Sequence, residues 1–191
     1  MADELETRPF ASAEEWEAWL REHHETVPGV WIKFAKKASG VPTVTYLEAL
    51  HGALRYGWID GQARSLDDTH YLQRFTPRRA RSIWSKRNRD FATALIEAGE
   101  MEPAGLREVE RAKADGRWDA AYDAPSTATV PEDLQAALDA DPAAAEFFAS
   151  LDGQNRYAIL HRVQTAKRAE TRARRIEKFV AMLAAGEKIH P

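Results

Sequence analysis

The sequence contains no cysteine, no long hydrophobic run and no low-complexity tract. The lack of cysteine excludes a disulfide scaffold and any thiol or Cys-based metal chemistry. No apolar stretch approaches the roughly 18 residues that a membrane-spanning helix needs. The chain opens on Met-Ala-Asp-Glu-Leu-Glu, which contains no hydrophobic segment of the secretory type. We therefore expect a cytoplasmic protein, a location that the lack of cysteine also fits.

The remaining composition is that of a folded globular protein. Of the 191 residues, 44% are hydrophobic and 30% are charged, and six are tryptophans. A chain of this length buries one substantial core or two small ones, and its many aromatic side chains favour burial over disorder. The formal net charge is only −3, which argues against a general polyanion-binding protein.

The charge is unevenly distributed along the chain. Residues 74–89 hold seven Arg or Lys and no acid, and residues 156–178 hold eight Arg or Lys against two glutamates. Such segments either provide a local anion site or pair internally with the acidic remainder of the chain. In the second segment Arg168, Arg172 and Arg175 share one side of a helix. We expect this stripe to pair with the acidic N-terminal half.

Three short segments in the first half have strand patterns. Residues 30–36 alternate, with Val30, Ile32 and Phe34 on one side and Trp31, Lys33 and Ala35 on the other. Residues 58–66 and 70–76 form two further strands, and Asp67-Asp68-Thr69 between them predicts a tight hairpin turn.

Helices alternate with these strands. Ser12 to Glu15 and Thr45 to Glu48 have the spacing of capping boxes, and each precedes an amphipathic stretch. Two further helices are expected from about Ser85 to Gly99 and from Pro103 to Asp115. Residues 1–118 therefore predict an α+β domain, in which helices pack on a small mixed sheet.

The second half has no strand pattern. Residues 119–130 lack any period and predict a linker or a strapped loop. Residues 131–191 predict an all-helical C-terminal region. Within it, residues 155–185 form either one long amphipathic helix or two helices that separate near Ala169. We expect the helical region to pack on the first domain.

The basic segment between residues 74 and 89 is the strongest candidate for a binding site. Guanidinium groups suit phosphate and carboxylate, and the start of a helix adds backbone N–H donors. A tryptophan among them offers a stacking face for a base, a sugar ring or a guanidinium. The candidate ligand-binding residues of this pocket are Arg74, Arg78, Arg79, Arg81, Trp84 and Lys86. In the alternative interpretation Trp84 fills a gap between sheet and helix, and the arginines pair with acids such as Asp60, Asp90 or Glu97.

Other chemistry is weakly indicated. Asp60 lies in a strand between Gly57 and Gly61, and His51 on the preceding helix could line the same pocket. The sequence has no His-Glu-x-x-His pair, no Gly-x-Gly-x-x-Gly, no Walker loop and no Gly-x-Ser-x-Gly. We therefore expect no metal and no cofactor, and assign no catalytic residue.

Three stretches carry a family resemblance. They are Gly57-Trp-Ile-Asp-Gly61, the segment from Arg74 to Asn88, and Ala166-Lys-Arg-Ala-Glu-Thr-Arg-Ala-Arg-Arg-Ile176. In order and spacing the chain resembles the YdeI/OmpD-associated proteins, also called bacteriocin-protection proteins, from about residue 8 to 186. The resemblance implies a bacterial source, an α+β N-terminal part and a helical C-terminal part. It also implies a link with envelope stress or with resistance to cationic peptides, but it carries over no catalytic residue.

These observations favour a non-enzymatic accessory protein of stress protection, which binds an anionic small molecule or a protein partner through the basic segment. Two alternatives stay open. One is nucleic-acid binding, although a sequence pI near 6.1 argues against a broad footprint. The other is a small-molecule enzyme that uses Asp60 and His51 with an arginine clamp.

Overall fold

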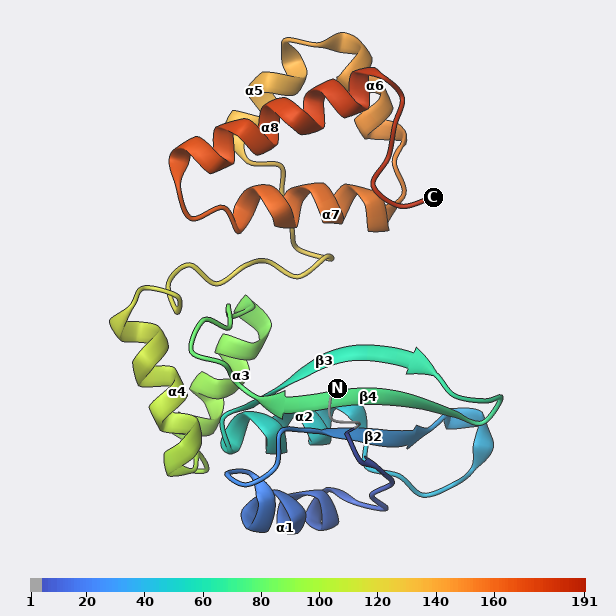
Figure 1. The fold of residues 1–191 in the computed structure, drawn as a ribbon, viewed down its shortest axis with the longest axis vertical. Helices are drawn as coiled ribbons and strands as arrows, with labels where there is room; N and C mark the ends of the chain where they lie inside the picture. Colours follow the sequence, from blue (N-terminus) through green and yellow to red (C-terminus); the bar gives the residue numbers. More distant parts are fainter. Residues whose placement is uncertain (1–4) are drawn as a thin grey trace. The chain divides into compact units, whose positions relative to one another are not determined.

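The computed structural model describes residues 5–191, which separate into two compact units. The first unit comprises the chain up to residue 84 together with 88–119, and the second comprises 85–87 together with 120–191. The first unit contains a four-stranded mixed sheet with helices, and the second is helical (Figure 1). The α+β fold class predicted from the sequence is confirmed.

The sheet of the first unit has the strand order β1-β2-β4-β3. Strand β1 pairs parallel to β2, while β2 with β4 and β4 with β3 are antiparallel. Its strands are β1 (Thr7–Arg8), β2 (Val30–Ala35), β3 (Trp58–Ser65) and β4 (His70–Pro77). The sequence analysis predicted the last three but missed β1, because two residues are too short to show a period.

The helices of the first unit begin where local signals place them. Thr45 and Glu48 form a complete capping box, whereas the Glu15 carboxylate accepts from the backbone N–H of Ala11, one residue before the cap at Ser12. The helices are α1 (Ala13–His23), α2 (Tyr46–Arg55), α3 (Lys86–Glu97) and α4 (Pro103–Ala114), with a short 3-10 turn at Lys37–Ser39.

The core of the first unit lies between one face of the sheet and helices α1 and α2 (Figure 1). The indole of Trp16 stacks on that of Trp19 with ring centroids 5.3 Å apart. Both belong to the same core cluster as the buried side chains of β2, which are Val30, Ile32 and Phe34. Truncation of one such aromatic side chain to alanine costs about 3–5 kcal/mol, so this cluster supplies much of the stability of the unit.

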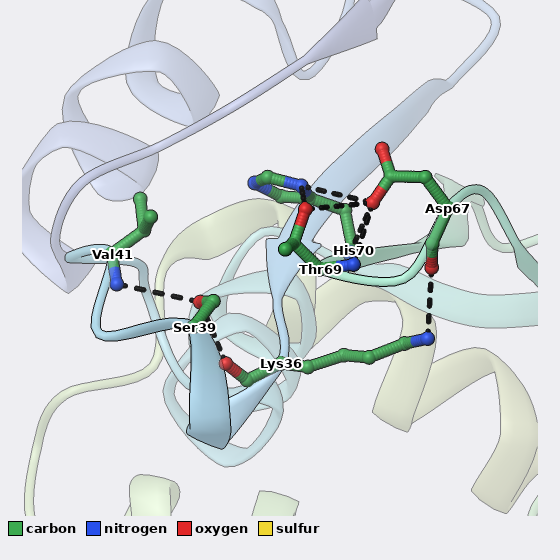
Figure 2. Close-up of polar contacts among 6 residues, drawn as sticks. All are labelled: Lys36, Ser39, Val41, Asp67, Thr69 and His70. Carbon is green, nitrogen blue, oxygen red and sulfur yellow. Dashed lines mark hydrogen bonds and ion pairs between the residues drawn. The ribbon is translucent and has the colours of Figure 1, made fainter.

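The β3–β4 hairpin closes with the predicted turn (Figure 2). The Asp67 carboxylate accepts from the backbone N–H groups of Thr69 at 2.8 Å and His70 at 2.7 Å. The Thr69 hydroxyl also donates to it and, with these N–H groups, holds the pKa of Asp67 well below its ordinary range. Lys36 Nζ donates to the Asp67 carbonyl at 2.8 Å, which ties the 3-10 turn to the hairpin.

Helix α4 approaches the C-terminal end of α2 very closely. A Cβ at Gly105 would lie only 2.3 Å from the carbonyl oxygen of Arg55 and 2.7 Å from that of Leu54. Gly57, which follows α2, has a left-handed φ of 73°. A Cβ at this position would lie 2.8 Å from the carbonyl oxygen of Ala104. Glycine at both positions allows the two backbones to meet.

The second unit packs its helices around a single aliphatic and aromatic core. They are α5 (Glu132–Asp139), α6 (Pro142–Ser150), α7 (Gly153–Gln164) and α8 (Ala169–Ala184). The long amphipathic tract of the sequence is thus two helices, which was the second of the two alternatives.

The sequence predicted that this stripe pairs with the acidic N-terminal half, but the structure gives Arg172 its partners inside the second unit. Its Nε and Nη2 donate to the two carboxylate oxygens of Asp133 on α5, at 2.5 and 2.8 Å, and its Nη1 donates to the carbonyl of Val163 at 2.9 Å. Arg175 donates to the carbonyl of Arg162. Arg172 and Arg175 therefore bind α5 and the open carbonyls at the end of α7, which lie much nearer in the chain.

Candidate anion-binding site

Trp84 is buried in the first unit, so it offers no open stacking face. Its side chain is 2% exposed. The guanidinium carbon of Arg78 lies 3.5 Å from the ring centroid, and the Trp118 ring meets it edge-on at 4.9 Å. Arg78 is itself only 6% exposed and donates to the Ile83 carbonyl at 3.4 Å. The arrangement matches the alternative interpretation, in which Trp84 fills a gap in the core.

The hollow beside Arg78 is small. It has a volume of about 120 Å³ and is lined in part by Gly57, Trp58 and Pro77. Ligand pockets typically measure about 300–1,000 Å³. This hollow is smaller than a typical ligand pocket.

The other residues of the basic segment are dispersed. Lys86 belongs to the second unit, where its ammonium lies 2.6 Å from the Asp123 carboxylate and lowers the pKa of that acid. Arg79 and Arg81 are exposed in the loop that follows β4. Arg74 lies on β4 itself. The structure thus separates the residues that the sequence had grouped into one pocket.

Asp60 and His51 do not meet an arginine clamp. Asp60 accepts a hydrogen bond from the Tyr46 hydroxyl at 2.8 Å, on the sheet face that α2 covers, whereas Arg74 on the adjacent strand projects from the opposite face. The His51 ring meets Phe91 edge-on at 4.6 Å, and its buried Nε2 has no hydrogen-bond partner. Within residues 5–191 no hydrogen bond or ion pair joins Asp60 to His51. The arrangement gives the enzyme alternative no support.

The described chain offers neither a metal site nor a membrane-spanning helix. Among residues 5–191 no group of three or more His, Cys, Asp or Glu side chains is placed to hold a metal ion. The same part of the chain has no helix with the length and hydropathy needed to cross a bilayer.

Arg74 belongs to a different cluster, on the solvent side of the sheet. Opposite residues of paired strands point to the same face. Trp31 on β2 lies opposite Arg74 on β4, and in the next row Lys33 lies opposite Leu72, which lies opposite Arg64 on β3. We call these five residues, on the face away from α1 and α2, the open sheet face.

Both arginines of the open sheet face lie against the indole of Trp31. The guanidinium carbon of Arg64 is 4.4 Å from the ring centroid, and that of Arg74 is 6.0 Å from it. Because β4 lies between β3 and β2, the Arg64 side chain must cross β4 to reach Trp31. Leu72 of β4 is directly opposite Arg64 on the same face, and it is 2% exposed. The arginine is therefore held by a cation–π contact at one end and by packing along its stem.

Gly61 makes room for the second guanidinium. A Cβ at this position would lie 3.1 Å from Nε and 3.3 Å from Nη2 of Arg74. The residue sits in a β-bulge between Asp60 and Ala63, where Gln73 donates to its carbonyl at 2.7 Å. A glycine here allows the guanidinium to lie close over the backbone of β3, beside Trp31.

In the part of the chain that the structure describes, the positive charge of the open sheet face has no carboxylate partner. Among the described residues, no carboxylate pairs with Lys33, Arg64 or Arg74, and none of these three side chains donates a hydrogen bond. None of the strand residues that share this face is acidic. Three cations around one partly exposed indole therefore form a local positive patch on a protein of near-neutral charge.

The sequence analysis identified only Arg74 among the cations of this cluster. The alternation of residues 30–36 had already placed Trp31 and Lys33 on the polar side of a half-buried strand. A tryptophan on that side was the available signal, because an indole placed toward solvent needs a partner. Arg64 gave no such signal, since the bulge before Ala63 shifts the alternation of β3.

Two family models match the chain. Residues 8–108 match the family described as Domain of unknown function (DUF8412), which covers more than half of the chain and includes the open sheet face. Residues 127–186 match the family described as Bacteriocin-protection, YdeI or OmpD-Associated. The resemblance predicted from the sequence is thus confirmed in the second unit, while the stretches at Gly57–Gly61 and Arg74–Asn88 fall within the first match. No curated protein and no solved structure matches the chain significantly.

Proposed function

The chain belongs to the DUF8412 family through residues 8–108 and carries a YdeI/OmpD-associated domain at residues 127–186, and we propose that it is a binding protein that holds an anionic ligand on the open sheet face. The observation that carries this proposal is the pair of guanidiniums, those of Arg64 and Arg74, placed against Trp31 without a carboxylate partner among the described residues. The proposal assigns no reaction.

The geometry suits anion capture for a physical reason. A guanidinium that lies over an aromatic ring keeps the N–H donors at its edge free for phosphate or carboxylate. The stacking also limits the rotamers of a long side chain before the ligand arrives, so less conformational entropy is lost on binding. Lys33 adds a third charge in the neighbouring row of the sheet.

The description of the family that residues 127–186 match supports a role in protection against bacteriocins. On that support we place the binding activity in envelope stress or antimicrobial-peptide protection, as an accessory protein. A cytoplasmic location stays a prediction, which fractionation of expressing cells tests directly.

The proposal is tested with tripolyphosphate as a defined polyanion, by isothermal titration of the full chain. Arg64→Ala/Arg74→Ala is compared with Arg79→Ala/Arg81→Ala, which removes the same charge from the exposed loop that follows β4. Loss of two charge-assisted hydrogen bonds should weaken binding by at least about tenfold in the first variant. Retained affinity in that variant with loss in the second would move the site to the basic segment and refute the proposal.

A further inference from the structure

The open sheet face is extended, and its charges come from separate strands. Trp31 and Lys33 lie two residues apart on β2, which places them about 7 Å apart along the strand. Arg64 and Arg74 come from β3 and β4, one row apart in the register. A small anion is held best by donors that converge in a concave site. Charges spread along a sheet instead fit an anion that repeats along a chain.

The same face also offers a planar apolar element. The indole of Trp31 and the Arg64 guanidinium lie together at 4.4 Å, and the methylene stem of Arg64 crosses above Leu72. An acidic peptide pairs with the cations, but it brings a flat ring only where it contains an aromatic residue. A nucleic acid brings both, because its phosphates meet the cations while a base stacks on a ring or on a guanidinium plane.

We infer that the ligand class of the open sheet face is single-stranded nucleic acid, bound over a short stretch of a few nucleotides. The inference rests on the proposed function and names its ligand. A net charge of −3 and a sequence pI near 6.1 argue against the broad basic footprint that grips a duplex. They do not oppose a local contact, because the field of three cations that lack a carboxylate partner within residues 5–191 acts mainly within a Debye length of about 8 Å at physiological salt.

The number of cations fixes a quantitative expectation. For a single strand, the logarithm of the binding constant falls with the logarithm of salt concentration with a slope of about −0.7 for each phosphate neutralised. Contacts from Lys33, Arg64 and Arg74 therefore give a slope of about −2. Stacking on Trp31 adds affinity that does not depend on salt.

The experiment measures fluorescence anisotropy of a labelled oligothymidylate of twelve nucleotides with the full chain, between 50 and 200 mM NaCl. The inference expects Arg64→Ala and Arg74→Ala each to bring the slope closer to zero by about 0.7. Trp31→Ala should weaken binding about fivefold or more and leave the slope unchanged. The matched control Lys37→Ala, which removes an exposed charge outside the open sheet face, should change neither quantity. Far-UV circular dichroism verifies that each variant is folded.

Three outcomes overturn the inference and separate its failure from that of the proposed function. If tripolyphosphate binds through Arg64 and Arg74 but the oligonucleotide does not, the proposed function stands and the ligand class is wrong. If polyglutamate of equal length binds as tightly as the oligonucleotide, the face recognises acidic peptides. If neither polyanion binds, or if the arginine variants leave the slope unchanged, the open sheet face is not the site.

Discussion

Replacement of Gly105 by alanine tests the closest approach between two helices of the first unit. A Cβ at this position would lie 2.3 Å from the carbonyl oxygen of Arg55 and 2.4 Å from Sδ of Met101. The Met101 side chain can rotate away, but the Arg55 carbonyl belongs to the end of α2 and moves only with the backbone. Gly105→Ala should therefore push α4 away from α2.

The sign of this effect depends on two opposing contributions. Alanine in a helix interior is favoured over glycine by about 1 kcal/mol. Overpacking of a tightly fitted contact costs about 1–3 kcal/mol, and a 2.3 Å approach to a backbone oxygen puts Gly105 at the upper end of that range. We expect the variant to lower the free energy of unfolding of the first unit by about 1–2 kcal/mol.

The assay uses the distribution of tryptophan. All six tryptophans lie between residues 16 and 118, so their fluorescence follows urea unfolding of the first unit alone. Gly153→Ala in α7 is the matched control, because a Cβ there meets no atom within 4 Å. Gly153→Ala should stabilise the second unit by up to about 1 kcal/mol. Far-UV circular dichroism should detect this change, while the tryptophan fluorescence midpoint should stay the same. A fluorescence midpoint for Gly105→Ala equal to that of the wild type would refute the close approach of α4 to α2.

The remaining predictions concern the second unit, the hairpin and the open sheet face. Arg172→Ala should destabilise the second unit by about 1–2 kcal/mol. At most about 1 kcal/mol comes from the half-exposed ion pair with Asp133, and the rest comes from the lost hydrogen bond to the Val163 carbonyl. Urea unfolding followed by circular dichroism measures this loss of stability. The folded pKa of Asp67 is depressed, so its contribution to stability is present above its ordinary value of about 3.9 and is lost as pH falls below it. Asp67→Asn should reduce that loss in fluorescence-detected urea unfolding at pH 5 and pH 3. Gly61→Ala should weaken tripolyphosphate binding severalfold without moving the fluorescence midpoint, because the displaced atoms belong to the Arg74 side chain.

Each of these three predictions has a control variant or an outcome that would contradict it. Arg174→Ala removes an exposed charge from the same helix and should change stability by less than about 0.5 kcal/mol; an equal loss in both arginine variants would mean that general charge matters, and not the contacts of Arg172. An acid sensitivity that persists in full in Asp67→Asn would assign it to other carboxylates. Unchanged tripolyphosphate binding in Gly61→Ala would mean that the position of Arg74 over the bulge is unimportant.

The secondary structure was predictable where its cause is local. The helix caps at Ser12 and Thr45 and the alternation of residues 30–36 depend on neighbours within a few positions, and the two helices and the strand that they predict are present, although only Thr45 forms a complete capping box. The division of the C-terminal tract into two helices was less accessible. Its end at Gln164 is stabilised by guanidiniums from the next helix, and periodicity does not report such contacts.

The binding site was harder to predict, because burial and pairing depend on contacts distant in sequence. A run of arginines around Trp84 has the same composition whether the indole faces solvent or the core. Arg78 covers that indole, while the partner of Lys86 lies at Asp123, in a segment predicted to be a linker. The cluster at Trp31 draws one residue or more from each of three strands, and only the strand order brings Arg64 to it.

The place of Leu72 beneath Arg64 has a thermodynamic consequence. A ligand that pulls this guanidinium outward exposes Leu72, which is 2% exposed in the structure. The free-energy cost is about 25 cal/mol for every Å² of apolar surface that becomes exposed to water. A compact inorganic ion has no apolar surface that could cover Leu72 again, whereas a ligand with a hydrocarbon surface can pack on it in place of the arginine stem. The heat-capacity change on association distinguishes the two cases, since it is negative only when water leaves apolar surface. Calorimetry at several temperatures would therefore show whether the arginine stem stays in place or is exchanged for part of the ligand.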